Sequence, residues 1–302
     1  LLLSFFTAAG IMLFQAQDIF HNSDDNNPLV DRPTLESKSH LSAFQQNDNP
    51  GDVITDLSGF DNYDIGIDYA EQHVTTNPLN PLQIFVSANG SGAPQNARNT
   101  MDGGLTWTLN NPAYQSGTCC DPWAAYLING TLIYGSGVSG QYIYRSTTNG
   151  NSWTSPVLSV SGNDRNTLAA EETGTGPFAS YLYAAITPGN FSRSTDLGLS
   201  WSQTYTSSNT VPGTMIAVGP NGTTNGGCVI YVTNTGSTVP VNYTFHRSTN
   251  GGASGSFQVM SSLNVAGYVG TFNSAGRLVI NNARTRPYPM IAMDNSNGPY
   301  RG

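Results

Sequence analysis

Residues 194–201 read Ser-Thr-Asp-Leu-Gly-Leu-Ser-Trp, and the same order of residue types returns three more times along the chain. We call this pattern the box: Ser or Thr, any residue, Asp, Asn or Thr, any residue, Gly, any residue, Ser or Thr, and an aromatic residue. The other copies begin at Thr100, Ser146 and Ser248. Measured between the third positions 102, 148, 196 and 250, the spacings are 46, 48 and 54 residues. Such a period suits one four-stranded blade of a β-propeller.

The residue types of the box suit a tight reversal between two strands. A hydroxyl in the first position and a polar side chain in the third can accept hydrogen bonds from the amides of a turn. The Gly adopts a backbone conformation that a Cβ would resist, and the aromatic residue opens the next strand and packs between blades. The fourth copy lacks the Trp, and Phe257 is expected to replace it. The predicted structural residues are Thr100, Asp102, Gly104, Trp107, Ser146, Thr148, Gly150, Trp153, Ser194, Asp196, Gly198, Trp201, Ser248, Asn250 and Gly252.

With four boxes at blade spacing, residues 63–302 resemble the Asp-box (bacterial neuraminidase) repeat of the sialidase-like β-propellers. The resemblance implies an all-β propeller whose boxes lie at the blade periphery and are structural. It does not imply an activity, because the same box occurs in sialidases, other glycan-active propellers, sortilin-type receptors, photosystem assembly factors and many other secreted proteins. An Arg precedes the box at Arg145, Arg193 and Arg247, and its stem is expected to lie along the sheet with the charged head in water.

Short apolar runs between Gly, Asn and Pro turns predict strands, for example at 83–86, 131–134 and 229–232. No helical periodicity follows residue 20. Residues 168–178 align without a gap with 290–300, which predicts another innermost strand shortly before residue 302. We therefore expect four to five blades of a propeller of six to eight, truncated at the C-terminus. Their predicted spans are 63–115, 116–160, 161–210, 211–265 and 266 onward.

The N-terminal residues differ in character from the rest. Leu1–Phe14 is an apolar run too short for a confident membrane span, and residues 1–17 are predicted to be a signal peptide that lacks its first residues, with a buried helix as the alternative. Residues 18–62 are polar and are predicted to form an N-terminal arm, ahead of a propeller over 63–302. The expected location is secreted or at the cell surface, in a bacterium, with no membrane insertion of the mature form.

Charge excludes some partners. Charged residues make up 10% of the 302 residues, the net charge is −8, and no run of Lys or Arg exists. Nucleic-acid binding and binding to an anionic membrane are therefore disfavoured. The expected partners are a glycan or an extracellular protein, and the chain is expected to be a monomer.

The sequence gives little indication of a metal site or of a disulfide. The three cysteines, Cys119, Cys120 and Cys228, include no CxxC pair, so no zinc site is expected. They are either free thiols or hold one disulfide between Cys228 and one of the other two, since adjacent cysteines rarely pair. No cofactor is expected. Four carboxylates could bind calcium in a loop, although they lack the alternating spacing of a calcium-binding loop. They are Asp24, Asp25, Asp61 and Asp64.

Polar residues that precede predicted innermost strands are candidates for a central site. They form a possible channel rim of Asp121, Asp164, Arg165, Arg284 and Arg286. The first functional hypothesis is a secreted module that binds glycan or protein at its central face, without proven catalysis. The second is an exo-sialidase-type glycoside hydrolase, which requires three arginines converging on one carboxylate. The third is a structural module of a larger surface protein. Catalytic residues are not assigned.

Overall fold

The computed structural model describes two compact units of the chain. Unit 1 comprises Leu1–Gln45, Asp68–Ala70 and Val269–Arg286, and unit 2 comprises Gln46–Ile67, Glu71–Tyr268 and Pro287–Gly302. The described residues are 53–55, 61–63, 65, 71–89, 96–118, 120–137, 139–210, 213–235, 240–266, 271–272, 274, 278–280, 283–284 and 288–302. The predicted signal peptide lies outside them, as does most of the predicted arm.

Four antiparallel sheets of four strands follow one another along unit 2. Within each sheet, strands that are consecutive in sequence are hydrogen-bonded neighbours, so each sheet is a simple meander. The strands are β3 (His73–Thr76), β4 (Ile84–Ala88), β5 (Asn96–Thr100) and β6 (Thr108–Leu109); β7 (Trp123–Tyr126), β8 (Leu132–Ser136), β9 (Gly140–Ser146) and β10 (Val157–Ser161); β11 (Thr167–Ala170), β12 (Leu182–Ile186), β13 (Asn190–Ser194) and β14 (Ser202–Thr206); β15 (Met215–Asn221), β16 (Thr224–Thr235), β17 (Val241–Ser248) and β18 (Gln258–Val265).

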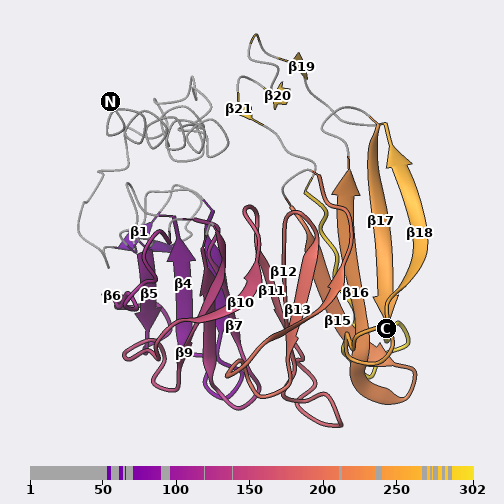
Figure 1. Cartoon of the computed structure of the whole chain (residues 1–302). Coiled ribbons are helices and arrows are strands. Elements are labelled where there is room, and N and C mark those ends of the chain that lie inside the picture. The colour runs from indigo at the N-terminus through magenta and orange to yellow at the C-terminus, as the bar shows by residue number, and fades with distance from the viewer. Residues whose placement is uncertain are drawn as a thin grey trace, which may run out of the picture. The chain divides into compact units, whose positions relative to one another are not determined.

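The first strands of the four sheets are neighbours in space. Strand β7 contacts β3 and β11, and β11 also contacts β15, so the sheets radiate from a shared inner row of strands (Figure 1). This is the blade arrangement of a β-propeller, and it confirms the predicted all-β fold and the four blades predicted over 63–265. Among the described residues no helix is long and apolar enough to cross a membrane.

Aromatic and aliphatic side chains fill the space between neighbouring blades. Phe85 of the first blade is fully buried and lies 5.7 Å, between ring centroids, from Trp153 of the second. Phe191 of the third blade lies 5.3 Å from Tyr231 of the fourth. Phe257, the expected replacement for the missing Trp, packs 4.9 Å from Phe191. Burying one such ring contributes about 1.5–3 kcal/mol, so these layers hold adjacent blades together.

The four boxes form turns with the same hydrogen bonds. The first-position hydroxyl accepts from the backbone amide of the fifth-position Gly at 2.8–3.0 Å, and from the third-position amide at 3.1–3.3 Å. In the first and third copies the Asp carboxylate accepts from the seventh-position amide at 2.9 Å. Each of these Gly residues has positive φ, which a side chain would disfavour. The box is therefore a self-contained turn.

Two of the three arginines that precede the boxes, Arg145 and Arg193, differ from expectation. Arg145 donates from Nε to the carbonyl of Leu197 at 2.7 Å, and Arg193 donates from Nη1 to the carbonyl of Gly251 at 2.8 Å. Each acceptor is the fourth residue of the box in the next blade. The charged heads therefore bridge adjacent blades instead of lying in water, because the neighbouring turn offers a carbonyl within their reach.

Outside the four blades, the described residues add two small sheets. In unit 2, β1 (Val53–Thr55) pairs with β2 (Asp61–Tyr63), inside the predicted arm. In unit 1, β19 (Thr271–Phe272), β20 (Leu278–Ile280) and β21 (Ala283–Arg284) form one antiparallel sheet.

From residue 266 onward, where an incomplete fifth blade is expected, the described residues form no four-stranded sheet. The described residues 288–302 contain no strand, although they return to unit 2 and pack beside β15. There the Asn295 side-chain amide donates to the Val218 carbonyl at 3.2 Å.

Candidate functional site

Four residues hold matching positions at one end of the inner strands. Glu71, Asp121, Arg165 and Gly213 each stand two residues before the first residue of β3, β7, β11 and β15. Because these strands are neighbours, the matching positions gather at the same end of the inner row. We call this region the channel mouth. It comprises these four residues with Asn89 and Tyr288.

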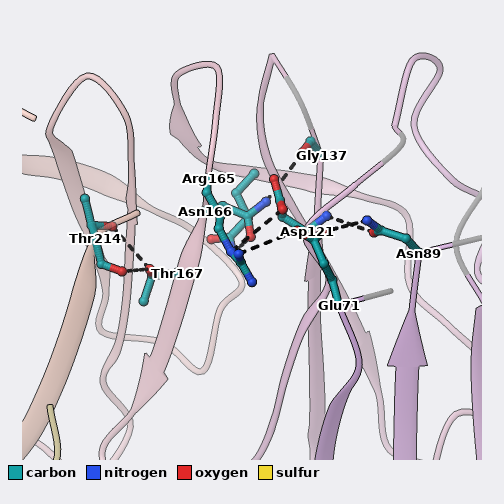
Figure 2. A network of polar contacts seen from close by, with 9 residues as sticks. Glu71, Asn89, Asp121, Gly137, Arg165, Asn166, Thr167 and Thr214 are labelled. Carbon is teal, nitrogen blue, oxygen red and sulfur yellow. Dashed lines mark hydrogen bonds and ion pairs between the residues drawn. The ribbon is translucent and has the colours of Figure 1, made fainter. Parts of the chain in front are cut away.

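A partly buried ionic network occupies the mouth (Figure 2). Arg165 Nη1 lies 3.5 Å from Glu71 Oε1, and Arg165 Nε lies 3.8 Å from Asp121 Oδ1. The Asp121 carboxyl is also hydrogen-bonded to Glu71. Side-chain exposure is 5% for Asp121, 17% for Glu71 and 26% for Arg165. One guanidinium is thus held between two carboxyl groups and remains the most accessible of the three.

Asn89, which follows β4, is hydrogen-bonded to both acidic residues. Its Nδ2 donates to Glu71 Oε2 at 2.6 Å, and its Oδ1 accepts from the Asp121 amide at 3.1 Å. Glu71 and Asp121 both have positive φ, of 61° and 54°. Positive φ is uncommon for residues other than Gly and costs roughly 1 kcal/mol each. Surrounding contacts must therefore hold both loops in place, and Asn89 supplies them at both.

The acidity of Asp121 is strongly altered. Burial raises its pKa well above the ordinary value, and the nearby Glu71 and Asp164 charges raise it further, whereas Arg165 opposes them. A carboxyl group in such surroundings favours its neutral form and donates a hydrogen bond. The mouth thus combines a hydrogen-bond donor at Asp121 with an acceptor at Glu71.

Tyr288 covers Arg165 from the last described segment of the chain. The guanidinium carbon lies 4.5 Å from the centre of the Tyr288 ring, and the two side chains are hydrogen-bonded. This is the geometry of a cation–π contact. At Gly213 a Cβ would overlap the Tyr288 ring, so the absence of a side chain there makes room for the tyrosine. Residues 288–302 therefore contribute to the mouth.

A cavity of about 320 Å³ lies between the inner strands. Its lining includes His73 and Trp123, which are the first residues of β3 and β7 and stand 4.5 Å apart between ring centroids. Burial and the Arg165 charge lower the pKa of His73 to about 4. His73 Nδ1 accepts from the Ala124 amide at 3.2 Å, as a neutral imidazole can. Residues 168–170, 216–218 and 291–293 also line the cavity.

Of the predicted rim, the structure brings Asp121 and Arg165 together. Asp164 acts on Asp121 through its charge. Arg286 and the side chain of Arg284 lie outside the described residues. Sequence reasoning missed Glu71, Asn89 and Tyr288. The shared two-residue offset before each inner strand is the signal that identifies Glu71.

The cysteines differ from both sequence alternatives. Cys228 is a buried free thiol, whereas Cys120 is disulfide-bonded. A disulfide of Cys228 is therefore wrong, and so is a free thiol at Cys120. No group of three or more His, Cys, Asp and Glu side chains suited to a metal ion occurs in the part of the chain that the structure describes. Of the calcium candidates, Asp24, Asp25, Asp64 and the side chain of Asp61 lie outside it.

These features define the protein as a β-propeller with a polar network at one end of its central cavity. No family model and no curated protein matches the sequence. Solved structures similar to the chain include the GH93 α-L-arabinofuranosidase of Fusarium graminearum with arabinobiose, with a TM-score of 0.42 at 15% identity over 65% of this chain and 68% of that one. A protein of unknown function from Dyadobacter fermentans gives 0.44 at 16% identity, over 65% and 68%. An ancestral GH74 enzyme gives 0.45 at 17%, over 65% and 25%.

Proposed function

We propose that this chain binds a carbohydrate at the channel mouth. The network of Glu71, Asp121 and Arg165 at the end of the central cavity carries the proposal. A carboxyl group that accepts, at Glu71, and a planar guanidinium that donates, at Arg165, suit adjacent sugar hydroxyls, each of which both donates and accepts. The half-buried Trp123 offers an aromatic face just inside the cavity. Pockets of this kind combine apolar walls with a few fixed polar groups.

The charge at the mouth favours a neutral saccharide. Arg165 is the cation of the network, and it is already held by Glu71 and Asp121. Asp164 adds a further acidic group, and the chain carries a net charge of −8. An anionic sugar would have to displace these carboxyl groups to reach the guanidinium. We therefore propose neutral oligosaccharides as the ligand class.

Binding is better supported than hydrolysis. Retaining glycosidases hold their two carboxyl groups about 5 Å apart, and inverting ones hold them further apart, to leave space for the reacting atoms. Glu71 and Asp121 are hydrogen-bonded directly to each other. A sialidase also needs three converging arginines, and among the arginine side chains that the structure describes only Arg165 lies in this network.

Secretion is part of the same proposal. The disulfide at Cys120 supports an oxidising compartment, because cytosolic thiols are kept reduced. A location outside the cytoplasm is also where a protein would meet polysaccharides.

The test is a calorimetric titration of the purified chain with a panel of neutral and sialylated oligosaccharides. We expect binding of at least one neutral member, weakened tenfold or more in Glu71→Gln and Arg165→Gln, with no release of monosaccharide. Asp294→Asn is the matched control, because the Asp294 carboxylate is hydrogen-bonded within its own turn, to the Ser296 amide, and lies outside the mouth network. Binding confined to sialylated members, or equal binding by the mouth variants, would refute the proposal.

A further inference from the structure

The three arginines that precede a box have matching positions but different hydrogen bonds. Arg145 and Arg193 each donate to the carbonyl of the fourth box residue in the next blade, at 2.7 Å and 2.8 Å. Arg247 holds the same position in the fourth blade. Its Nε is buried and has no hydrogen-bond acceptor among the described residues. A buried donor without an acceptor is destabilising, so the fourth blade presents a cationic donor that lacks the carbonyl bound by its two counterparts.

In the second and third blades the side chains beside the arginine are covered. Ile133 pairs with Arg145 across the sheet, and Ile143 lies two residues before that arginine. Both isoleucines are at most 1% exposed, because Leu182 and Trp201 of the third blade pack over them. The third blade repeats this arrangement with two aromatic side chains, which the fourth blade covers. Each of these faces is therefore closed by the blade that follows it.

The same two positions of the fourth blade, Ile230 and Phe245, are only half-buried. Together with Arg247 and Met260 they line a groove of about 520 Å³, to which residues of the segment 288–302 also contribute. We call it the Arg247 groove. Met260, which belongs to the outermost strand β18, is 53% exposed. Apolar walls beside a buried donor without an acceptor are typical of a surface that binds another polypeptide.

We propose that the Arg247 groove binds a β-hairpin of another protein, and that this hairpin carries a box turn. The two covered faces define the occupant. At each, the next blade supplies an aliphatic residue of its second strand, Leu182 or Val229, an aromatic ring that follows the box glycine, and the carbonyl of the fourth box residue. A hairpin of the same kind would cover Ile230 and Phe245 and offer a carbonyl to Arg247.

The charge of the chain disfavours a second copy as the occupant. Each copy has a net charge of −8, so two copies repel each other. A hairpin of a less acidic protein avoids this repulsion, and the carbonyl that it presents to Arg247 needs no charge. The groove shares none of the channel-mouth residues, so hairpin binding is independent of carbohydrate binding.

Binding is tested with a synthetic peptide of residues 180–201, which form the covering hairpin and box of the third blade. The peptide carries Tyr183→Thr and Phe191→Thr for solubility, because both side chains face the fourth blade. With a fluorescein-labelled peptide we expect saturable binding by anisotropy, weakened tenfold or more by Arg247→Met in the chain and lost with Leu182→Asp in the peptide. No binding, or equal binding by the Arg247 variant, would overturn the proposal.

Urea unfolding tests the state of Arg247 without any ligand. Arg145→Met removes a hydrogen bond that is already made, so it should lower the unfolding midpoint by about 0.3 M. Arg247→Met keeps the length of the side chain and removes a donor that has no acceptor, so the midpoint should stay unchanged or rise. Equal losses in the two variants would show that the Arg247 donor is already satisfied, and would overturn the proposal.

Sedimentation equilibrium separates a hairpin of another protein from a second copy of this chain. We expect a monomer at micromolar concentration for both the unmodified chain and Arg247→Met. A dimer that Arg247→Met dissociates would make a second copy the occupant and overturn the proposal. None of these measurements uses a sugar, so they stand whether or not a carbohydrate binds at the channel mouth.

Discussion

The first hydroxyl of a box should contribute far more to stability than the second. Ser194 is 1% exposed, and its Oγ accepts from the Gly198 amide at 2.8 Å and the Asp196 amide at 3.3 Å. It also donates to Asp196 Oδ1 at 2.7 Å. Ser194→Ala leaves the buried Gly198 amide without its acceptor, which costs about 1–3 kcal/mol, and removes a hydrogen bond to a charged group worth about 1.5–3 kcal/mol. Because these contributions share one small side chain, we expect a total loss of about 3 kcal/mol.

The matched control is Ser200→Ala in the same box. The Ser200 hydroxyl is exposed and donates to Asp196 Oδ2 at 2.6 Å, so its loss should change stability by no more than about 0.5 kcal/mol. The assay is urea unfolding followed by tryptophan fluorescence. With a slope of about 3 kcal/mol per molar urea, Ser194→Ala should lower the midpoint by about 1 M. Equal shifts in the two variants would refute the reasoning that the buried hydroxyl pins the turn.

Three further predictions concern charged groups. Arg193→Gln, which removes the bond to the Gly251 carbonyl, should cost about 1 kcal/mol in urea unfolding; an unchanged unfolding midpoint would contradict this. The pKa of Asp121 is raised in the folded state, so the folded chain keeps a proton that the unfolded chain loses, and the free energy of unfolding should fall as pH rises above 3.8. Asp121→Asn should remove this fall. An unchanged dependence of the unfolding free energy on pH in that variant would contradict the assignment to Asp121. Burial lowers the pKa of His246 to about 4 from 6.5, so the neutral imidazole stabilises the fold fully above pH 6.5, and this stabilisation is lost as pH falls towards 4. His246→Gln should flatten the plot of unfolding free energy against pH between these values. An unaltered plot would show that His246 is not the source of the slope.

The fold was predictable because the box is a local device. Its hydrogen bonds join residues two and four positions apart, so one stretch such as 194–201 contains the whole turn. Four copies at blade spacing then imply a repeating sheet. The pre-box arginines were harder to interpret. Arg145 reaches Leu197 in the next blade, and no local pattern gives the distance between blades.

The described residues form four complete blades, the lower of the two numbers that the sequence predicted, because sequence likeness does not supply strand partners. Residues 290–300 align with 168–178, and they do pack beside β15. A strand, however, needs a hydrogen-bonded neighbour. In the aligned segment that neighbour is β12, which pairs with β11. No corresponding partner pairs with 290–295 among the described residues.

The candidate site was predictable only in part. Asp121 and Arg165 precede segments whose residues predict strands, so their position at the end of the inner strands could be predicted. Glu71 was missed because β3 reads His-Val-Thr-Thr, which contains one aliphatic residue and gives little strand signal. Tyr288 was missed because it meets Gly213 across 75 positions of sequence, and only the folded chain brings them together.

The most direct test of the account is a crystal structure of the chain bound to a neutral oligosaccharide selected by calorimetry. The account predicts sugar density at the channel mouth, with hydroxyl groups within hydrogen-bond distance of Glu71 and Arg165 and the ring near Trp123. Sugar density only on the outer strands, with the mouth network undisturbed, would contradict it.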